Sequence, residues 1–91
     1  MPSITVRGVG VETQAARLVT VFTLSEPPSP AWIAFFRERA RYSVFDTAAA
    51  TFRQNHLRVD LPRREDLEQL IRSVERFIEG ANLDMEYRQP P

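Results

Sequence analysis

The chain has 91 residues and a mass of 10.5 kDa, which accommodates a single domain with one hydrophobic core. Twelve basic and twelve acidic residues give a net charge of zero, so no overall field attracts the chain to nucleic acid or to an anionic membrane. The absence of Cys excludes disulfides, thiolate catalysis and cysteine-ligated zinc, and a single His argues against a transition-metal site. We therefore expect neither a metal nor a cofactor.

The sequence predicts a cytoplasmic protein that does not enter a membrane. No apolar run approaches the roughly 20 residues that a membrane-spanning helix needs, and the first residues lack the pattern of a secretory signal. All twelve basic residues are Arg, and Lys is absent. Because Arg pairs with carboxylates in a fork and stacks on aromatic rings, this surface is more adhesive than a Lys surface would be.

Two strands are expected in the first quarter of the chain. Residues 3–11 alternate in polarity until Gly8 and Gly10 interrupt the pattern, which is typical of an edge strand that ends or bulges. A turn over residues 12–15 would follow. Residues 17–24 are apolar on both faces and rich in β-branched side chains, which indicates a strand inside the sheet. The two strands are expected to form a hairpin.

A helix is predicted after the proline-rich joint that ends at Pro30. Ser29 is a favourable N-cap, and Pro30 suits the first helical position because its missing N–H would be unpaired there. The helix would run to about residues 41–43. Helical spacing places one apolar stripe toward the sheet, made of Trp32, Ile33, Phe36 and Ala40.

Residues 47–61 alternate as a β-hairpin would, with a two-residue turn at Gln54 and Asn55. Asn55 is the residue expected to tolerate a positive φ in that turn. This register places Phe52 opposite Leu57 and Ala50 opposite Val59 on the buried side, with Thr51 opposite Arg58 and Arg53 opposite His56 on the other side.

The clearest helix covers Arg64 to about Glu79, because apolar residues including Phe77 recur at helical spacing. Gly80 would end it. Residues 83–87 fit either a short final strand or a continuation of the helix, and residues 89–91 are expected to be disordered.

The predicted fold is therefore α+β, a two-layer sandwich of a mostly antiparallel sheet with two helices on one face, in the order ββαββα over one domain of residues 1–88. A final strand would complete a ferredoxin-like βαββαβ core. The strand order cannot be read from the sequence, nor whether residues 3–11 cover the open sheet face.

No catalytic constellation stands out, and we expect a protein that is not an enzyme. His56 is predicted to lie at a turn beside Arg53, which disfavours a charged imidazole. The carboxylates of Glu65 and Asp66 suit a helix start, and Asp84 and Glu86 would be exposed on a terminal strand. The Gly8–Gly10 segment lacks the third Gly, the helix and the Lys of phosphate-binding loops.

The first candidate binding surface is the sheet face opposite the helices. It would present an apolar strip of Val19 and Val21 flanked by Arg17, Arg53 and Arg58, which is the composition of a modest protein interface. The alternative is a nucleic-acid-binding face using the same three arginines. That alternative lacks exposed aromatic residues for base stacking and a net positive charge.

The second candidate surface is a flank of the first helix, where Phe35 and Tyr42 fall to one side of the apolar stripe and Arg39 lies between them and that stripe. Aromatic and Arg side chains dominate the energetics of protein interfaces. We expect a small non-enzymatic protein–protein interaction domain, whose partner is another protein or a second copy that binds through either surface or edge to edge through the first strand. The sequence identifies neither the partner nor the pathway.

Overall fold

The computed structural model describes residues 3–41 and 50–88. The elements follow the predicted order: β1 (Val6–Gln14), β2 (Arg17–Leu24), α1 (Pro30–Ala40), β3 (Thr51–Arg53), β4 (His56–Leu61), and a short 3₁₀ turn (Arg64–Asp66) that leads into α2 (Leu67–Tyr87). The predictions for Tyr42, for residues 47–49 and for the disordered tail at 89–91 fall outside the described residues.

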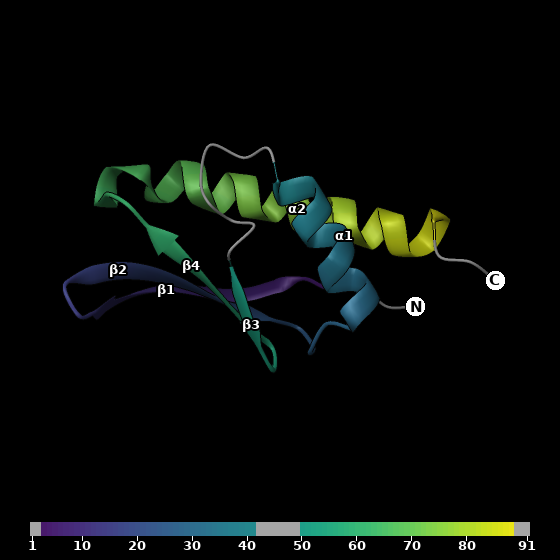
Figure 1. Ribbon diagram of the computed structural model, residues 1–91, viewed down its shortest axis with the longest axis horizontal. Coiled ribbons are helices and arrows are strands. Elements are labelled where there is room, and N and C mark those ends of the chain that lie inside the picture. The colour runs from purple at the N-terminus through teal and green to yellow at the C-terminus, as the bar shows by residue number, and fades with distance from the viewer. Residues whose placement is uncertain (1–2, 42–49, 89–91) are drawn as a thin grey trace.

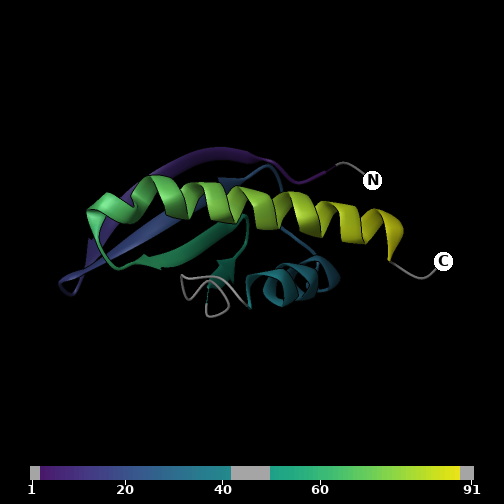
Figure 2. The ribbon, with the colours of Figure 1, turned by 90° about the horizontal axis from the view of Figure 1, so that it is seen from above.

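The four strands form one antiparallel sheet in the order β1-β2-β4-β3. Both helices lie on the same side of this sheet, which confirms the predicted α+β sandwich (Figure 1). Viewed from above, α2 runs over the strands and α1 lies beside it (Figure 2). Insertion of β4 between β2 and β3 makes a split β-α-β arrangement, and β1 takes the edge next to β2.

Helix α2 continues to Tyr87, so residues 83–87 continue the helix and do not form a final strand. The prediction that Gly80 ends the helix is wrong, since Gly80 lies buried within it. A Cβ atom at Gly80 would overlap the side chain of Arg39 on α1. The absence of a side chain at Gly80 therefore leaves room for the Arg39 side chain, and this glycine does not end the helix.

The core lies between the sheet and the helices and has an aromatic centre. Phe36 is fully buried, and its ring lies 5.3 Å from that of Phe52, 5.6 Å from that of Trp32 and 6.0 Å from that of Phe77. Ser29 caps α1 by accepting a hydrogen bond from the backbone N–H of Trp32, as expected from its position before Pro30. The predicted stripe of α1 thus faces the core, with Ile33 half-buried at its margin.

β1 does not end at its glycines. The strand bulges between Val6 and Gly8, as predicted, but then pairs with β2 as far as Gln14. The turn lies at Ala15 and Ala16 and not over residues 12–15, and both alanines have positive φ angles, of 48° and 66°. Residues other than Gly, Asn and Asp rarely adopt such angles, so the turn is unfavourable, and the eight residue pairs between the two strands compensate for it.

The β3–β4 hairpin has the predicted turn and register, with Phe52 opposite Leu57. The residue with positive φ is Gln54, at 54°, and not Asn55. Asn55 instead binds the backbone of Leu24 on β2: its carbonyl accepts from the Leu24 N–H, and its side-chain amide donates to the Leu24 carbonyl. Ala50 is buried but lies outside the ladder, since β3 begins at residue 51.

One buried hydroxyl in the core is unsatisfied, and its removal is expected to stabilise the protein. Thr20 on β2 is fully buried, and its Oγ1 has no hydrogen-bond partner among the described residues. Because valine has nearly the same shape, Thr20→Val is expected to raise the free energy of unfolding by about 1 kcal/mol. Urea denaturation followed by circular dichroism measures this; a loss of stability would show that the hydroxyl is satisfied in solution.

Candidate interaction surfaces

The sheet face opposite the helices carries the first predicted surface. The register places Arg17, Val19, Val21 and Thr23 of β2 on this face. Neighbouring positions come from β1, β4 and β3, and they are Gly8, Gly10, Glu12, Gln14, His56, Arg58, Asp60, Thr51 and Arg53. The structure therefore brings together all five residues predicted for this surface.

Ion pairs cross this open sheet face and cover part of its apolar strip. Arg58 on β4 donates to Glu12 on β1 at 2.8 Å, so their side chains reach across the intervening β2. Arg17 pairs with Asp60. Val19 is only 7% exposed, so the expectation of an exposed Val19 is wrong, and Val21 is half-buried. The face is largely polar, as expected of a solvated face of an antiparallel sheet.

These ion pairs make nucleic-acid binding by this face less favourable. Arg17 and Arg58, two of the three arginines it requires, have carboxylate partners within the chain. Arg53 lies on the short strand β3, opposite a half-buried His56. Phosphate binding would have to compete with the existing pairs, which reduces the favourable electrostatic contribution of these side chains.

The flank of α1 is held by contacts within the chain. Arg39 donates to both carboxylate oxygens of Asp84 on α2, at 2.8 and 2.9 Å. Asp84 is 4% exposed, so the expectation of an exposed carboxylate at this position is wrong. The Arg39 hydrogen bonds lower the pKa of Asp84 below its usual value, against burial, which acts in the opposite direction. This pair joins the two helices directly above Gly80.

Phe35 on the same flank is half-buried and packs against the core. The Arg88 guanidinium at the end of α2 lies 5.1 Å from the centre of its ring, and Arg88 also pairs with Glu38 at 3.2 Å. Phe35 and Arg39 are thus brought together as predicted, and both have partners within the chain. The third predicted residue of this surface, Tyr42, lies outside the described residues.

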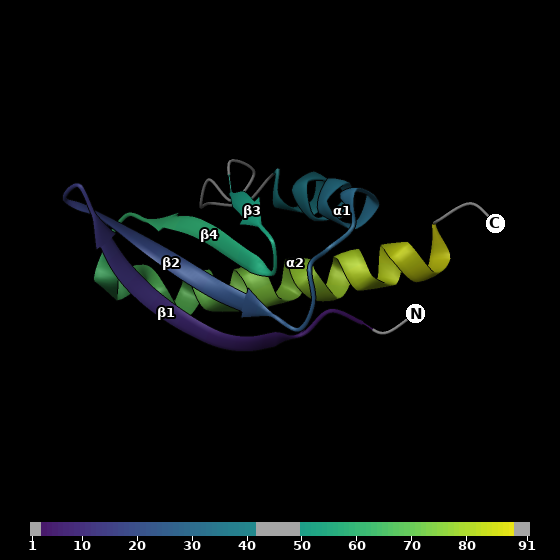
Figure 3. The same cartoon turned by 90° about the horizontal axis from the view of Figure 1, so that it is seen from below.

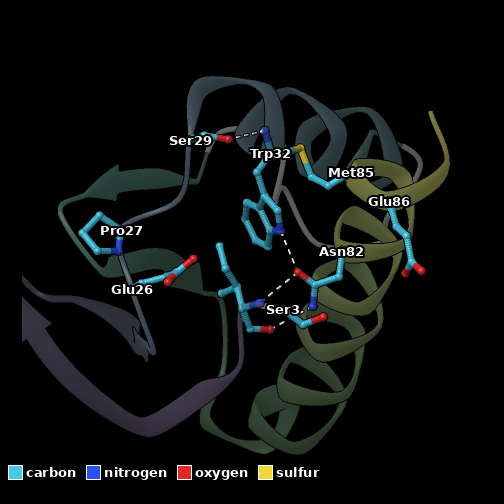
Figure 4. A pocket seen from close by; sticks show the side chains of 9 residues that line it. Ser3, Glu26, Pro27, Ser29, Trp32, Asn82, Met85 and Glu86 are labelled. Carbon is cyan, nitrogen blue, oxygen red and sulfur yellow. Dashed lines mark hydrogen bonds between the residues drawn. The ribbon is translucent and has the colours of Figure 1, made fainter. Parts of the chain in front are cut away.

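Asn82 on α2 fixes the start of the chain against both helices (Figure 4). Its Oδ1 accepts from the backbone N–H of Ile4 at 3.1 Å and from the indole N–H of Trp32 at 2.9 Å. Its Nδ2 donates to the Ile4 carbonyl at 2.9 Å. The amide therefore pairs with both backbone polar groups of Ile4, as a neighbouring strand would, and satisfies the buried indole.

A pocket of about 460 Å³ opens beside this amide, within the usual size range of small-molecule sites. The carboxylate residues Glu26 and Glu86 line it, and among the residues that the structure describes no basic one does. The remaining lining residues are Ser3, Ile4, Pro27, Ser29, Trp32, Asn82 and Met85. Trp32 and Ile4 are almost fully buried, so they form its floor. Its chemistry would suit a small organic cation.

The outer edge of β1 offers a different kind of surface. β1 is nine residues long and ends the sheet, so within residues 3–41 and 50–88 no strand pairs with its outer side (Figure 3). Val9, on the helix side of this strand, is 40% exposed, and Val11 beside it is half-buried. The opposite edge strand, β3, has only three residues. Short edges resist pairing with other chains, whereas long apolar edges favour it.

The sequence carries a signal for the long edge of β1 but none for the contact made by Asn82. The alternation of Val and Gly from Val9 to Val11 indicates a continuous strand, but two glycines also suggest an interruption. The side chain of Asn82 is separated from Ile4 by 78 positions, and no local pattern signals such a contact.

Among the described residues, no three His, Cys, Asp or Glu side chains are grouped so that they could hold a metal ion. None of the helices in the described parts of the chain combines the length and apolar character required to span a bilayer. Comparison with protein-family models, with curated proteins and with solved structures gives no match.

Proposed function

We propose that this chain is a non-enzymatic protein–protein interaction domain, and that its binding surface is the outer edge of β1. The observation that carries the proposal is the nine-residue edge with a partly exposed valine, which no strand in the described part of the chain pairs on its outer side. An extended segment of a partner can add to such an edge as a further strand, with main-chain hydrogen bonds giving affinity and alternate side chains giving specificity.

The two surfaces favoured by the sequence support an interaction role less well. Charged residues of the open sheet face form ion pairs with one another, and Arg58 with Glu12 is one of these pairs. The flank of α1 uses Arg39 and Phe35 in contacts with α2. Engagement of either surface by a partner would first have to break or cover these contacts. The backbone groups on the outer side of β1 have no such competing partner among the described residues.

A strand-forming peptide tests this edge directly. The probe is a ten-residue peptide of alternating Val and Thr, added to ¹⁵N-labelled protein at micromolar concentration. We expect amide shifts concentrated on residues 6–14. Val9→Lys is expected to weaken the affinity about tenfold, because the ammonium would be buried beside the added strand.

Thr51→Lys is the matched control, since it introduces the same side chain on the exposed edge strand at the other side of the sheet. It is expected to leave the affinity unchanged. Shifts centred on β3 or on the open sheet face, or no shifts at millimolar peptide, would contradict the proposal.

A further inference from the structure

Two glycines of β1 are not required by anything in the described chain. Gly8 and Gly10 have no positive φ angle, so their backbone conformation is open to any residue. A Cβ at either position would meet no atom within 4 Å. Yet glycine inside a strand costs stability and often marks a place where another backbone or a ligand approaches closely. The described chain therefore gives no reason for glycine at either position.

We infer that the partner of this edge is a second copy of the same chain, with the two β1 strands antiparallel about a two-fold axis through Gly10. This inference rests on the proposed function and names its partner. Pairing of this kind is isologous, so the same edge of each copy is used, and it would extend the sheet from four strands to eight.

Strand geometry restricts the register of such a pair. Residues directly opposite each other in an antiparallel pair point to the same face of the sheet, so a two-fold axis that preserves the faces must pass through a residue. Gly10 is the middle residue of β1, which spans Val6–Gln14. An axis through Gly10 therefore pairs residues 8–12 of the two copies in regular register, with the bulge between Val6 and Gly8 at the ends of the pair.

On the helix side, this register joins the apolar residues of the two copies. Val9 of each copy lies opposite Val11 of the other, so four valines form one cluster that continues the core across the new pair of strands. Val9, which is 40% exposed in the single chain, becomes covered. An axis through Val9 would place Val11 opposite the bulge at residues 6–8, and one through Val11 would place Val9 opposite Thr13.

On the open side, the same register explains both glycines. Gly10 meets Gly10 of the second copy at the axis, where the two strands have no side chains between them. Gly8 lies opposite Glu12 of the second copy, and its missing side chain leaves room for the Glu12–Arg58 pair that crosses this face. The pairing also brings the Arg7 end of one strand to the Glu12 end of the other, so opposite charges become neighbours.

Single-cysteine variants test the partner and the register together, since the native chain has no Cys. Opposed residues in an antiparallel pair have Cα atoms about 4.5–5.5 Å apart, within the range that a disulfide spans. Under mild oxidation, Gly10→Cys is expected to give a covalent dimer. Gly8→Cys and Glu12→Cys alone are expected to give little, and a mixture of these two variants is expected to give the crossed dimer. Sedimentation equilibrium of the unmodified chain shows whether it dimerises.

The possible results separate this inference from the proposed function. A dimer with the expected cross-linking pattern supports both the partner and the register. A Gly10→Cys variant that still sediments as a dimer but does not cross-link, or a Gly8→Cys variant that cross-links alone, overturns the register and with it the inference. A chain that stays monomeric at millimolar concentration overturns the second copy as partner, while the peptide titration decides independently whether the β1 edge binds a strand.

Discussion

Replacement of Phe36 by Ala is expected to lower the free energy of unfolding by about 3–5 kcal/mol. Phe36 is fully buried and contacts the rings of Trp32, Phe52 and Phe77, so its removal leaves a cavity where α1, α2 and β3 meet. Small domains are stable by only about 5–15 kcal/mol, so this single change removes much of the total. Urea denaturation at neutral pH measures the loss, provided that the variant still folds.

The neighbouring Phe35 provides the matched control. It is half-buried and covered on one side by Arg88, so Phe35→Ala is expected to cost roughly 1–2 kcal/mol. Phe77, which the sequence places in the core with Phe36, is also half-buried, and Phe77→Ala should fall between the two. Equal losses at Phe35 and Phe36 would mean that α1 is rotated from the orientation described here.

Replacement of Asp84 by Asn is expected to lower the free energy of unfolding by about 2 kcal/mol at pH 7. Breaking a buried ion pair costs about 3–5 kcal/mol, and the effect is smaller here because Arg39 is 43% exposed and can be hydrated. Asp60→Asn, which removes the partner of Arg17 in an exposed pair, is the control and should cost at most about 1 kcal/mol.

The pH dependence of this difference follows from the pKa of Asp84, which the Arg39 hydrogen bonds lower. A carboxyl whose pKa is lower in the folded state stabilises that state above its unfolded pKa of about 4. This contribution is lost as the pH falls through the folded pKa. Wild type and Asp84→Asn should therefore converge in stability as the solution becomes acidic. A difference that is as large at pH 2 as at pH 7 would contradict this role for the pair.

Periodicity and end signals predicted most of the architecture. The Ser29–Pro30 start of α1, the register of the second hairpin and the helical phase of Phe36 all depend on residues within a few positions of one another. Such signals act locally, so a single sequence contains them. The order of elements follows from these signals, and with it the two-layer α+β sandwich.

The errors arise where distant residues decide the structure. Gly80 is locally a helix stop, but the Arg39 side chain on another helix determines its use. Asp84 is locally an exposed acid, but a guanidinium 45 positions away makes its burial favourable. Val19 is buried and not exposed, because side chains from β1 and β4 cover this part of the face. Nothing near Val19 in the sequence signals these neighbours. Alternation gives the face on which a residue lies, and the side chains of neighbouring strands decide how exposed it is.

The attachment of Ile4 to Asn82 places the beginning of β1 beside the last third of α2, although 78 positions separate these residues. A linker from the end of α2 back to β1, with the chain opened between Ala15 and Ala16, would give a circular permutant that begins with β2 and ends with β1. Its order along the chain would be βαββαβ, the ferredoxin-like order, with the sheet unchanged. The two connectivities thus differ only in where the backbone is cut. The cut would make Ala15 and Ala16 the new chain ends, where no turn holds them at positive φ.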